Sequence, residues 1–243
     1  ANDGGVYSTS FKADPGTAQG DWSGDAVGKN STQFYGATKQ NGQDNYLAGA
    51  QDNGSQLINN ASPGINNSVL ATGGDGTYVF IDEDNEYIVT STQNGNYYYR
   101  DYATGQTSGY TIESTGAGGE FINPAALDSE ENYLFSTAPA GINRYKLEAS
   151  SATADVLTDA ALTGSVTAFK VSNLTSSPTL FMGTDSGKLV KLVNSTSTKT
   201  FTQTWTDLTG TSFVGSISSI ELGASENEIY VTFYNYGVTN IFY

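Results

Sequence analysis

The feature that most constrains the fold of this 243-residue chain is a short unit that recurs six times. In each copy an apolar or aromatic strand runs into a turn that ends in glycine, and another strand follows. The glycines that end the turns are Gly5, Gly54, Gly95, Gly141, Gly187 and Gly237, at intervals of 41 to 50 residues. A period of this size is typical of proteins that repeat one supersecondary unit many times.

The turns themselves predict tight β-hairpins. Three of them read Asp52-Asn53-Gly54, Gln93-Asn94-Gly95 and Asp185-Ser186-Gly187. Asn, Asp and Gly tolerate the positive φ angles that such hairpins need. We therefore expect each glycine to mark a hairpin between the second and third strands of a sheet, and the hairpins to be related by rotation about one axis.

A further apolar strand precedes most of these units, within residues 32–36, 77–82, 122–128, 166–171 and 217–222. Polar turns separate this strand from the unit, and no long segment shows the 3.6-residue hydrophobic period of a helix. Stretches such as 143–147 and 189–193 are assigned as the outer strands. The sequence thus predicts an all-β fold, a β-propeller of four-stranded blades with about five blades present.

We expect residues 1–243 to form a single partial propeller domain that belongs to a larger ring. The first turn, at Gly5, falls inside a blade, and the last residues have the pattern of a strand. The remaining blades or domains of the same polypeptide are therefore expected partners. Central strands should be buried where blades pack face to face. The residues predicted to form this core are Phe34, Val79, Phe80, Leu134, Phe169, Phe181, Ile220, Tyr230 and Val231.

Composition excludes several classes of function. The formal net charge is -15 with only ten basic residues, so the average field around the protein repels nucleic acids and anionic membranes. The chain has no Cys and no His, which excludes thiol catalysis, Ser-His-Asp arrangements and zinc or haem sites of the usual ligation. It also lacks an apolar run long enough to span a bilayer, so direct membrane insertion is not expected.

Several turns, in this order, resemble those of the BNR/sortilin-like propellers. Residues 2–7 are similar to the NDGGVY turn of that family, and residues 32–36 with 49–55 are similar to its TQFYG and GGxQDNGS pair. Residues 73–79 with 93–95 are similar to its GGDGGYV and QNG pair. The resemblance implies a secreted bacterial protein of the Bacteroidetes type on the outer cell surface. It further implies a role in adhesion, in glycan or protein binding, or as a rigid scaffold.

Two kinds of hydrolase occur on similar propellers. Sialidases clamp a carboxylate with three arginines; this chain has only Arg100 and Arg144, which excludes a sialidase site in this segment. Xyloglucan-cleaving propellers use two acidic side chains across a groove, for which Asp3, Asp52 and Asp75 are the candidates. Because all three lie in repeat turns, where Asp caps the backbone, we expect a non-catalytic module. The alternative is part of a glycoside hydrolase whose cleft other blades complete.

The aromatic run Tyr97, Tyr98 and Tyr99, together with Tyr102, is the candidate ligand-binding cluster. Exposed tyrosine rings offer a stacking platform for a sugar. Strand alternation places Tyr98 on one face of its sheet and Tyr97 and Tyr99 on the other. Packing between blades is therefore expected to account for part of the run.

One candidate metal site is present in a turn of the second complete repeat. Asp82, Glu83 and Asp84 supply three carboxylates, the hard oxygen ligands that calcium prefers. Calcium is the one cofactor that the sequence suggests. The competing interpretation is a solvated turn, because the spacing lacks the alternation of ligands found in calcium-binding loops.

Overall fold

The computed structural model describes residues 7–9, 23–24, 32–64, 66–102, 108–113, 119–198, 202–235, 237 and 239–243. Contacts group the chain into two compact units, Ala1–Gln33 and Phe34–Tyr243. In the first unit, β1 (Tyr7–Ser8) and β2 (Ser23–Gly24) form an antiparallel pair. The five blades all lie in the second unit. That residues 1–243 form a single partial propeller domain stays a prediction.

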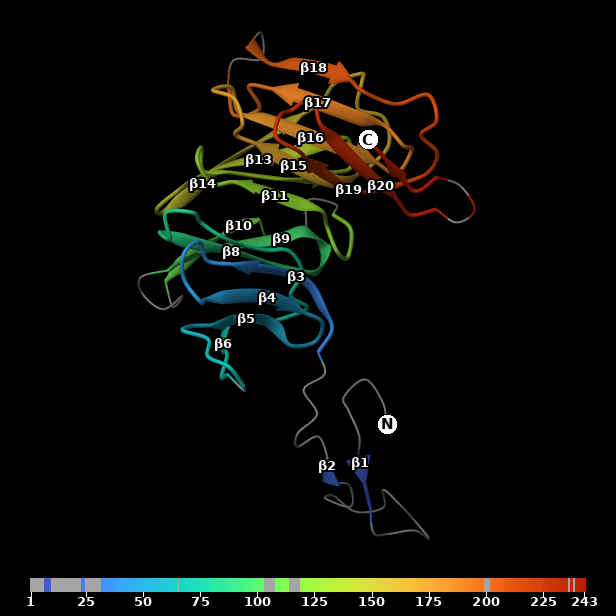
Figure 1. The fold of residues 1–243 in the computed structure, drawn as a ribbon. Coiled ribbons are helices and arrows are strands. Elements are labelled where there is room, and N and C mark those ends of the chain that lie inside the picture. Colours follow the sequence, from blue (N-terminus) through green and yellow to red (C-terminus); the bar gives the residue numbers. More distant parts are fainter. Residues whose placement is uncertain are drawn as a thin grey trace. The chain divides into compact units, whose positions relative to one another are not determined.

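The second unit is a β-propeller of five consecutive antiparallel sheets, or blades (Figure 1). Blade 1 contains β3 (Phe34–Lys39), β4 (Tyr46–Ala50), β5 (Gly54–Ile58) and β6 (Val69–Thr72). Blade 2 contains β7 (Val79–Ile81), β8 (Tyr87–Thr92), β9 (Asn96–Asp101) and β10 (Gly109–Glu113), with the short 3-10 turn η1 (Gln93–Gly95) before β9. Blade 3 contains β11 (Ala125–Asp128), β12 (Tyr133–Ala138), β13 (Gly141–Glu148) and β14 (Ser151–Leu157).

Blade 4 contains β15 (Val166–Ser172), β16 (Thr179–Thr184), β17 (Leu189–Val193) and β18 (Thr204–Asp207). Blade 5 contains β19 (Ile217–Leu222), β20 (Ile229–Phe233) and β21 (Ile241–Phe242). The predicted all-β propeller with about five blades is therefore confirmed for the part of the chain that the structure describes. Within those residues, no helix is long and apolar enough to cross a membrane.

The repeat glycines lie in β-hairpins, as the turn sequences predicted. Gly54, Gly95, Gly141, Gly187 and Gly237 all fall at the hairpin between the second and third strands of a blade, and all have φ between 69° and 103°. That left-handed conformation favours glycine, which has no Cβ to clash with the backbone. Gly5 lies outside the described residues.

The assignment of the outer strands was wrong. Residues 143–147 and 189–193 lie in β13 and β17, the third strands of blades 3 and 4. The outer strands are more polar segments such as β14, most of which is exposed. A strand with one side in solvent needs few apolar residues, so the hydrophobic pattern does not mark it.

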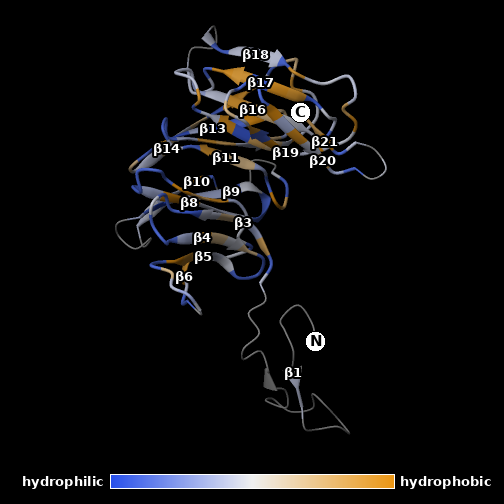
Figure 2. Ribbon diagram, in the orientation of Figure 1, coloured by the Kyte–Doolittle hydropathy of each residue, from blue (hydrophilic) through white to orange (hydrophobic). Residues whose placement is uncertain are grey.

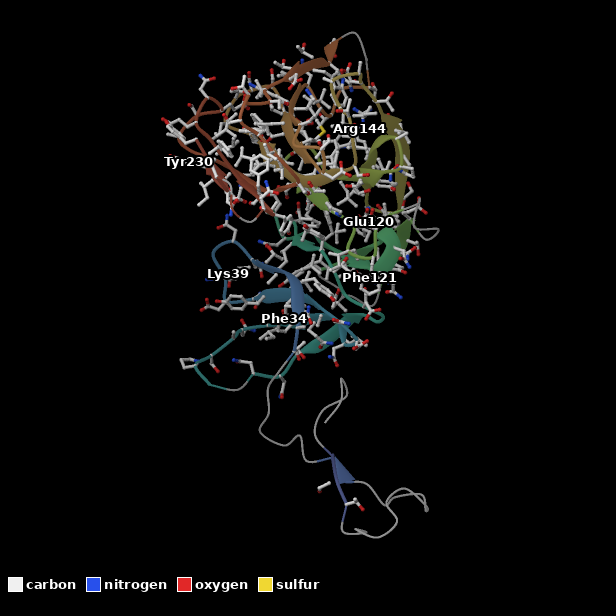
Figure 3. All side chains as sticks on the ribbon, turned by 90° about the vertical axis from the view of Figure 1, so that its right-hand side faces the viewer. Phe34, Lys39, Glu120, Phe121, Arg144 and Tyr230 are labelled. Carbon is white, nitrogen blue, oxygen red and sulfur yellow. The ribbon has the colours of Figure 1, made fainter. Side chains whose placement is uncertain are left out.

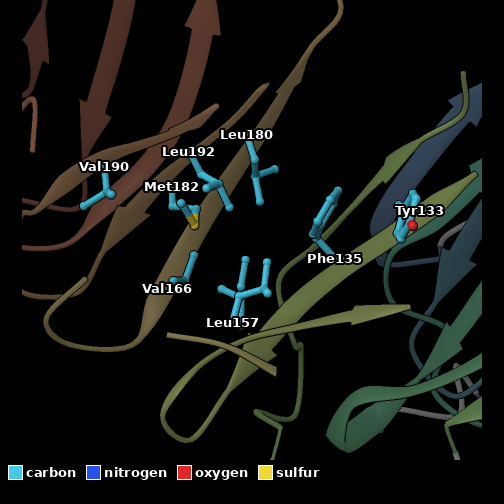
Figure 4. Packing of buried hydrophobic residues seen from close by; sticks show 9 residues of the cluster. Tyr133, Phe135, Leu157, Val166, Leu180, Met182, Val190 and Leu192 are labelled. Atoms are coloured by element: carbon cyan, nitrogen blue, oxygen red, sulfur yellow. The ribbon is translucent and has the colours of Figure 1, made fainter. Parts of the chain in front are cut away.

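Four hydrophobic clusters hold the blades together, and each lies between consecutive blades. Leu47 and Ile88 pack between blades 1 and 2, and Val89 and Leu134 pack between blades 2 and 3. Figure 4 shows the cluster between blades 3 and 4, which includes Phe135, Leu157, Leu180, Met182 and Leu192. The inner strands are correspondingly hydrophobic in colour in Figure 2, where β16 and β17 contrast with the paler outer strand β18. Burying each such side chain contributes about 1.5–3 kcal/mol before the entropic costs of folding.

Most of the predicted core residues are buried, and two are not. Val79, Leu134, Phe181, Ile220 and Val231 are buried, and Phe80 and Phe169 are half-buried against the clusters. The two exceptions are Phe34, which is 53% exposed, and Tyr230, which is 45% exposed.

Local geometry explains both exceptions. Phe34 is the first residue of β3, and the register with β4 shifts directly after it, so its side chain leaves the regular alternation. Tyr230 lies on β20 next to Val231, which packs toward blade 4, and therefore points to the opposite face of blade 5. There it stacks on Tyr243 with ring centroids 4.8 Å apart.

A second set of contacts links blade 2 to blade 3, blade 3 to blade 4 and blade 4 to blade 5 at the end of the propeller away from the hairpins. The Ser129 hydroxyl of blade 3 donates to the Asp82 carboxylate of blade 2. Asn173 Nδ2 of blade 4 donates to Asp128 Oδ1 of blade 3 at 3.4 Å, and Ser172 Oγ donates to Glu226 Oε1 of blade 5 at 2.8 Å. We call these three contacts the latches.

Candidate functional site

The second-to-third-strand hairpins and the connections between blades lie at one end of the propeller, which we call the hairpin end. This follows from four antiparallel strands per blade, because the chain leaves the second and fourth strands on the same side. It is the right-hand side in Figure 1, and Figure 3 views the molecule from there. Loops on a rigid scaffold are where binding residues usually lie.

Hydrogen bonds fix the loops of the hairpin end to one another. The Asp52 backbone N–H donates to Asp75 Oδ1 at 2.9 Å, and the Asp75 N–H donates to Gln93 Oε1 at 3.1 Å. In the same way, the Asn94 N–H donates to the Phe121 carbonyl at 3.1 Å. These three contacts join the hairpins of blades 1 and 2 to the connections beside them, so the surface is preorganised.

The large hydrophobic side chains exposed on these loops and strand ends include Phe34, Phe121, Val214 and Tyr234. Figure 3 shows Phe34 on blade 1 and Phe121, beside Glu120, near blades 2 and 3. Val214 lies in the connection between blades 4 and 5, and Tyr234 directly follows β20. This set was not predicted from the sequence, because Phe34 was assigned to the core and the connections between blades were not considered as binding loops. The sequence signal that could have revealed this surface is an aromatic or β-branched residue, such as Phe121 or Val214, within a connection between blades.

The charge of the hairpin end is negative. Its loops carry the carboxylates of Asp52, Asp75, Glu120, Asp159 and Asp185, with Asp207 at the end of β18. Of the lysines and arginines whose positions the structure describes, only Lys188 lies in these loops, and its ammonium group is 2.7 Å from Asp207 Oδ2. The Lys188 contact, with hydrogen bonds from Thr209, lowers the pKa of the Asp207 carboxyl to about 2.

Of the three catalytic candidates, Asp3 lies outside the described residues, and Asp52 and Asp75 are in direct contact. The Asp75 carboxylate accepts from the Asp52 backbone N–H, so it caps the neighbouring hairpin rather than its own turn. Asp52 itself has φ of 60° and belongs to the turn that precedes Gly54. A glycosidase needs two carboxyl groups on either side of a groove that holds the sugar. Neither Asp52 nor Asp75 lines the hollow of about 410 Å³ that opens between blades 3 and 4 at this end.

The structure does not bring the four candidate tyrosines together on one surface. Tyr97 is 1% exposed and Tyr99 is 7% exposed, and both pack between blades 2 and 3. Tyr99 stacks between Tyr87 and Tyr110, with centroids 4.7 and 4.8 Å away. The rings of Tyr97 and Tyr99 are therefore not available to a sugar, and the expected contribution of blade packing is confirmed for these two residues.

Tyr98 and Tyr102 are half-buried and lie apart from that stack. Tyr98 is on the opposite face of β9, as the alternation predicted, and the Arg100 guanidinium lies 5.2 Å from its ring centroid. The Tyr102 hydroxyl donates to Gln40 Oε1 at 2.8 Å and accepts from Asn45 Nδ2 at 2.9 Å. Tyr102 thus ties blade 2 to blade 1, and ligand binding by either residue stays a prediction.

The acidic turn 82–84 does not form a metal cage. Asp82 is buried, and its two carboxylate oxygens accept hydrogen bonds from the Ser129 hydroxyl and the Glu86 backbone N–H, whereas Glu83 and Asp84 are exposed. Across the described residues, no three His, Cys, Asp or Glu side chains come together in a group that could hold a metal ion. Asp82 acts in a latch between blades 2 and 3.

Asp128 occupies the equivalent position in blade 3, but only one of its two carboxylate oxygens has a hydrogen-bond partner. It is fully buried; its Oδ1 accepts from the Glu131 N–H at 3.1 Å and from Asn173, while its Oδ2 has no hydrogen-bond partner. Burial raises the pKa of the Asp128 carboxyl above its ordinary value, and the nearby Glu131 and Glu130 carboxylates raise it further, against the two hydrogen bonds. The native state therefore binds this proton more tightly than the unfolded state.

We expect this buried carboxyl to make the protein less stable as the pH rises. With a raised pKa in the native state, stability is lost as the pH increases from the ordinary value of 3.8 through the native pKa. Asp128→Asn removes this term, so the unfolding free energy of the variant minus that of the wild type should grow between about pH 4 and pH 7. Urea titrations across that range measure the difference. Asp84→Asn, in an exposed turn, is the control, and an equal slope in both variants would contradict the prediction.

Both arginines donate hydrogen bonds within the propeller. Arg100 is half-buried and donates from Nη1 to the Tyr99 carbonyl at 3.1 Å. Arg144, labelled in Figure 3, is 3% exposed and forms a bidentate pair with Asp155, with Nε 2.9 Å from Oδ1 and Nη2 2.6 Å from Oδ2. Its Nη1 donates to the carbonyls of Ser195 and Ser197 in blade 4 at 2.7 and 2.8 Å. Arg144 is thus a buried link between blades 3 and 4.

The fold is that of the β-propellers, and comparison with solved structures agrees. One similar structure is the β-propeller domain of Cps50 (Swd1) from Myceliophteria thermophila, with a TM-score of 0.65 and 13% identity over 86% of this chain and 69% of that chain. Another is a chain of the nidogen/laminin complex, with a TM-score of 0.60 and 11% identity over 84% of this chain and 73% of that chain. No family model matches the chain, and no curated protein matches it. Likenesses at these identities establish the fold alone.

Proposed function

We propose that this propeller is a non-catalytic module that binds a protein partner through its hairpin end. The observation that carries the proposal is that one end of the propeller exposes the hydrophobic side chains of Phe34, Phe121, Val214 and Tyr234, while hydrogen bonds fix the loops of that end to one another. Exposed aromatic anchors on a preorganised surface favour protein recognition, because little conformational freedom is lost on binding. The similar chain of the nidogen/laminin complex comes from an assembly of two proteins, which supports the proposal by analogy of fold.

Glycan binding and hydrolysis receive less support from the geometry. Two of the four tyrosines proposed as a sugar platform are buried, and Asp75 caps the turn that contains Asp52. The proposal includes a location outside the cell, as part of a secreted bacterial surface protein, because the turns resemble those of BNR/sortilin-like propellers. A surface protein that binds other proteins would act in adhesion, and this is the role that we propose.

A peptide selection tests the proposed function. A random peptide library displayed on phage is selected on the wild-type protein, and the affinities of the selected peptides are then measured by calorimetry. We expect Phe34→Ser and Phe121→Ser each to weaken binding at least roughly ten-fold, as anchor residues do. Tyr46→Ser is the matched control, because Tyr46 is also an exposed aromatic residue but begins β4 at the opposite end. Thermal unfolding of each variant confirms that it is folded.

Two outcomes would refute the proposed function. Peptides that bind equally well to the wild type and to both phenylalanine variants would place recognition elsewhere. Turnover of a β-glucan by the isolated protein, lost in Asp52→Asn or Asp75→Asn, would instead establish a hydrolase.

A further inference from the structure

A hollow of about 410 Å³ opens at the hairpin end between blades 3 and 4. The hairpin of blade 3 lines it with Pro139 and Ala140. The connection between the blades contributes Asp159 and Leu162, and the hairpin of blade 4 contributes Asp185. Three separate loops therefore form one concave site, and two of them contribute a carboxylate.

Hydrogen bonds hold both carboxylates in place. Asp159 Oδ1 accepts from the Ala161 N–H at 2.8 Å, and Asp185 Oδ1 accepts from the Ser165 N–H at 3.0 Å. Asp185 can approach the connection this closely because Gly164 lies beneath it; a Cβ on Gly164 would be 2.2 Å from Asp185 Oδ1. Each carboxylate is thus fixed through one oxygen, while both side chains remain exposed.

The remaining lining carries no charge and includes the hydroxyl side chains of Thr158 and Ser165. Pro139, Ala140 and Leu162 present hydrocarbon surface next to the two carboxylates. The only lysine of the hairpin end that the structure describes, Lys188, is paired with Asp207. The hollow thus combines two negative charges with an apolar wall. Long basic side chains have the complementary chemistry, because their aliphatic stems pack on apolar surface while the cationic head meets carboxylates.

We propose that this hollow binds an arginine or lysine side chain from a basic segment of the partner protein. The inference rests on the proposed function and adds the chemical class of the partner. The stem of the basic side chain lies along Leu162, Ala140 and Pro139, and its head lies between Asp159 and Asp185. Charge complementarity at such a site raises the association rate and makes binding sensitive to salt.

The peptides selected on the wild-type protein test the inference. We expect the selected sequences to be enriched in Arg and Lys, and replacement of the critical arginine by neutral citrulline, or of a lysine by norleucine, to weaken binding roughly ten-fold. Asp159→Asn and Asp185→Asn keep the oxygen that accepts from the backbone but remove the charge. Each should weaken binding of the charged peptide by a similar factor and have little effect on the neutral one. Asp84→Asn, an exposed carboxylate at the opposite end, should change neither.

The outcomes separate this inference from the proposed function. Peptides that depend on Phe121 but show no excess of basic residues, or bind Asp159→Asn and Asp185→Asn as tightly as the wild type, would overturn the inference and leave the function standing. Peptides insensitive to Phe34→Ser and Phe121→Ser, as well as to both aspartate variants, would overturn both. A Gly164→Ala variant gives an independent check, because displacement of Asp185 should weaken only peptides with the basic residue.

Discussion

Replacing Arg144 by methionine is expected to destabilise the protein by about 3 kcal/mol, the lower end of the range for breaking a buried ion pair. The lower end applies because Asp155, the partner carboxylate, is half-exposed and regains water when the guanidinium is lost. Ser195 is buried, and its carbonyl oxygen accepts a hydrogen bond from the Arg144 guanidinium. Loss of this charged donor adds to the destabilisation. Methionine keeps much of the packing volume, so the loss reports on the polar contacts.

Chemical denaturation measures this difference, and a second ion pair provides the control. Lys170 Nζ lies 2.6 Å from Glu221 Oε2, but the Lys170 side chain is 35% exposed and the Glu221 side chain 63% exposed. Lys170→Met should therefore cost less than about 1 kcal/mol. Equal losses in the two variants would show that Arg144 is not the buried link between blades 3 and 4 that its contacts indicate.

Replacing Gly49 by alanine is expected to destabilise the protein by at least about 3 kcal/mol, the upper end of the usual cost of overpacking. A Cβ at position 49 would lie 2.1 Å from the Thr77 carbonyl oxygen and 2.8 Å from the Gly76 carbonyl carbon. These are backbone atoms of the connection between blades 1 and 2, so no side-chain rotation relieves the clash. The two blades must separate, which opens the hydrophobic cluster between them.

Gly73→Ala is the matched control for this substitution, since a Cβ at position 73 meets nothing within 4 Å. Its effect should lie within about 0.5 kcal/mol. Thermal unfolding of the two variants compares them directly. A Gly49→Ala variant as stable as Gly73→Ala would mean that the close approach between blades 1 and 2 does not exist in solution.

The turns were the part of the fold most accessible to sequence reasoning. The positive φ angles at Gly54, Gly95 and Gly187 follow from local chemistry, because the preceding Asp, Asn and Ser residues favour tight turns. The outer strands were not accessible in this way. Residues in β14 face water along most of their length, so no apolar period distinguishes that strand from a loop.

The candidate site shows a similar division. Alternation along β9 correctly separated Tyr98 from Tyr97 and Tyr99, but the face that the next blade covers depends on contacts with residues such as Tyr145, far along the chain. The Arg144 link joins positions more than 50 residues apart and leaves no local signal. The location of the hairpins at one end follows from strand topology alone, and the sequence would have allowed that deduction.

Each of the four hydrophobic clusters and the three latches joins a blade to its immediate neighbour in the chain. The stability of such an arrangement is close to a sum of blade terms and nearest-neighbour coupling terms. A mechanical load applied between the two ends of the second unit would therefore be borne by these couplings in series. Blades would detach one after another as the weakest coupling yields, and single-molecule stretching would record a staircase of separate ruptures.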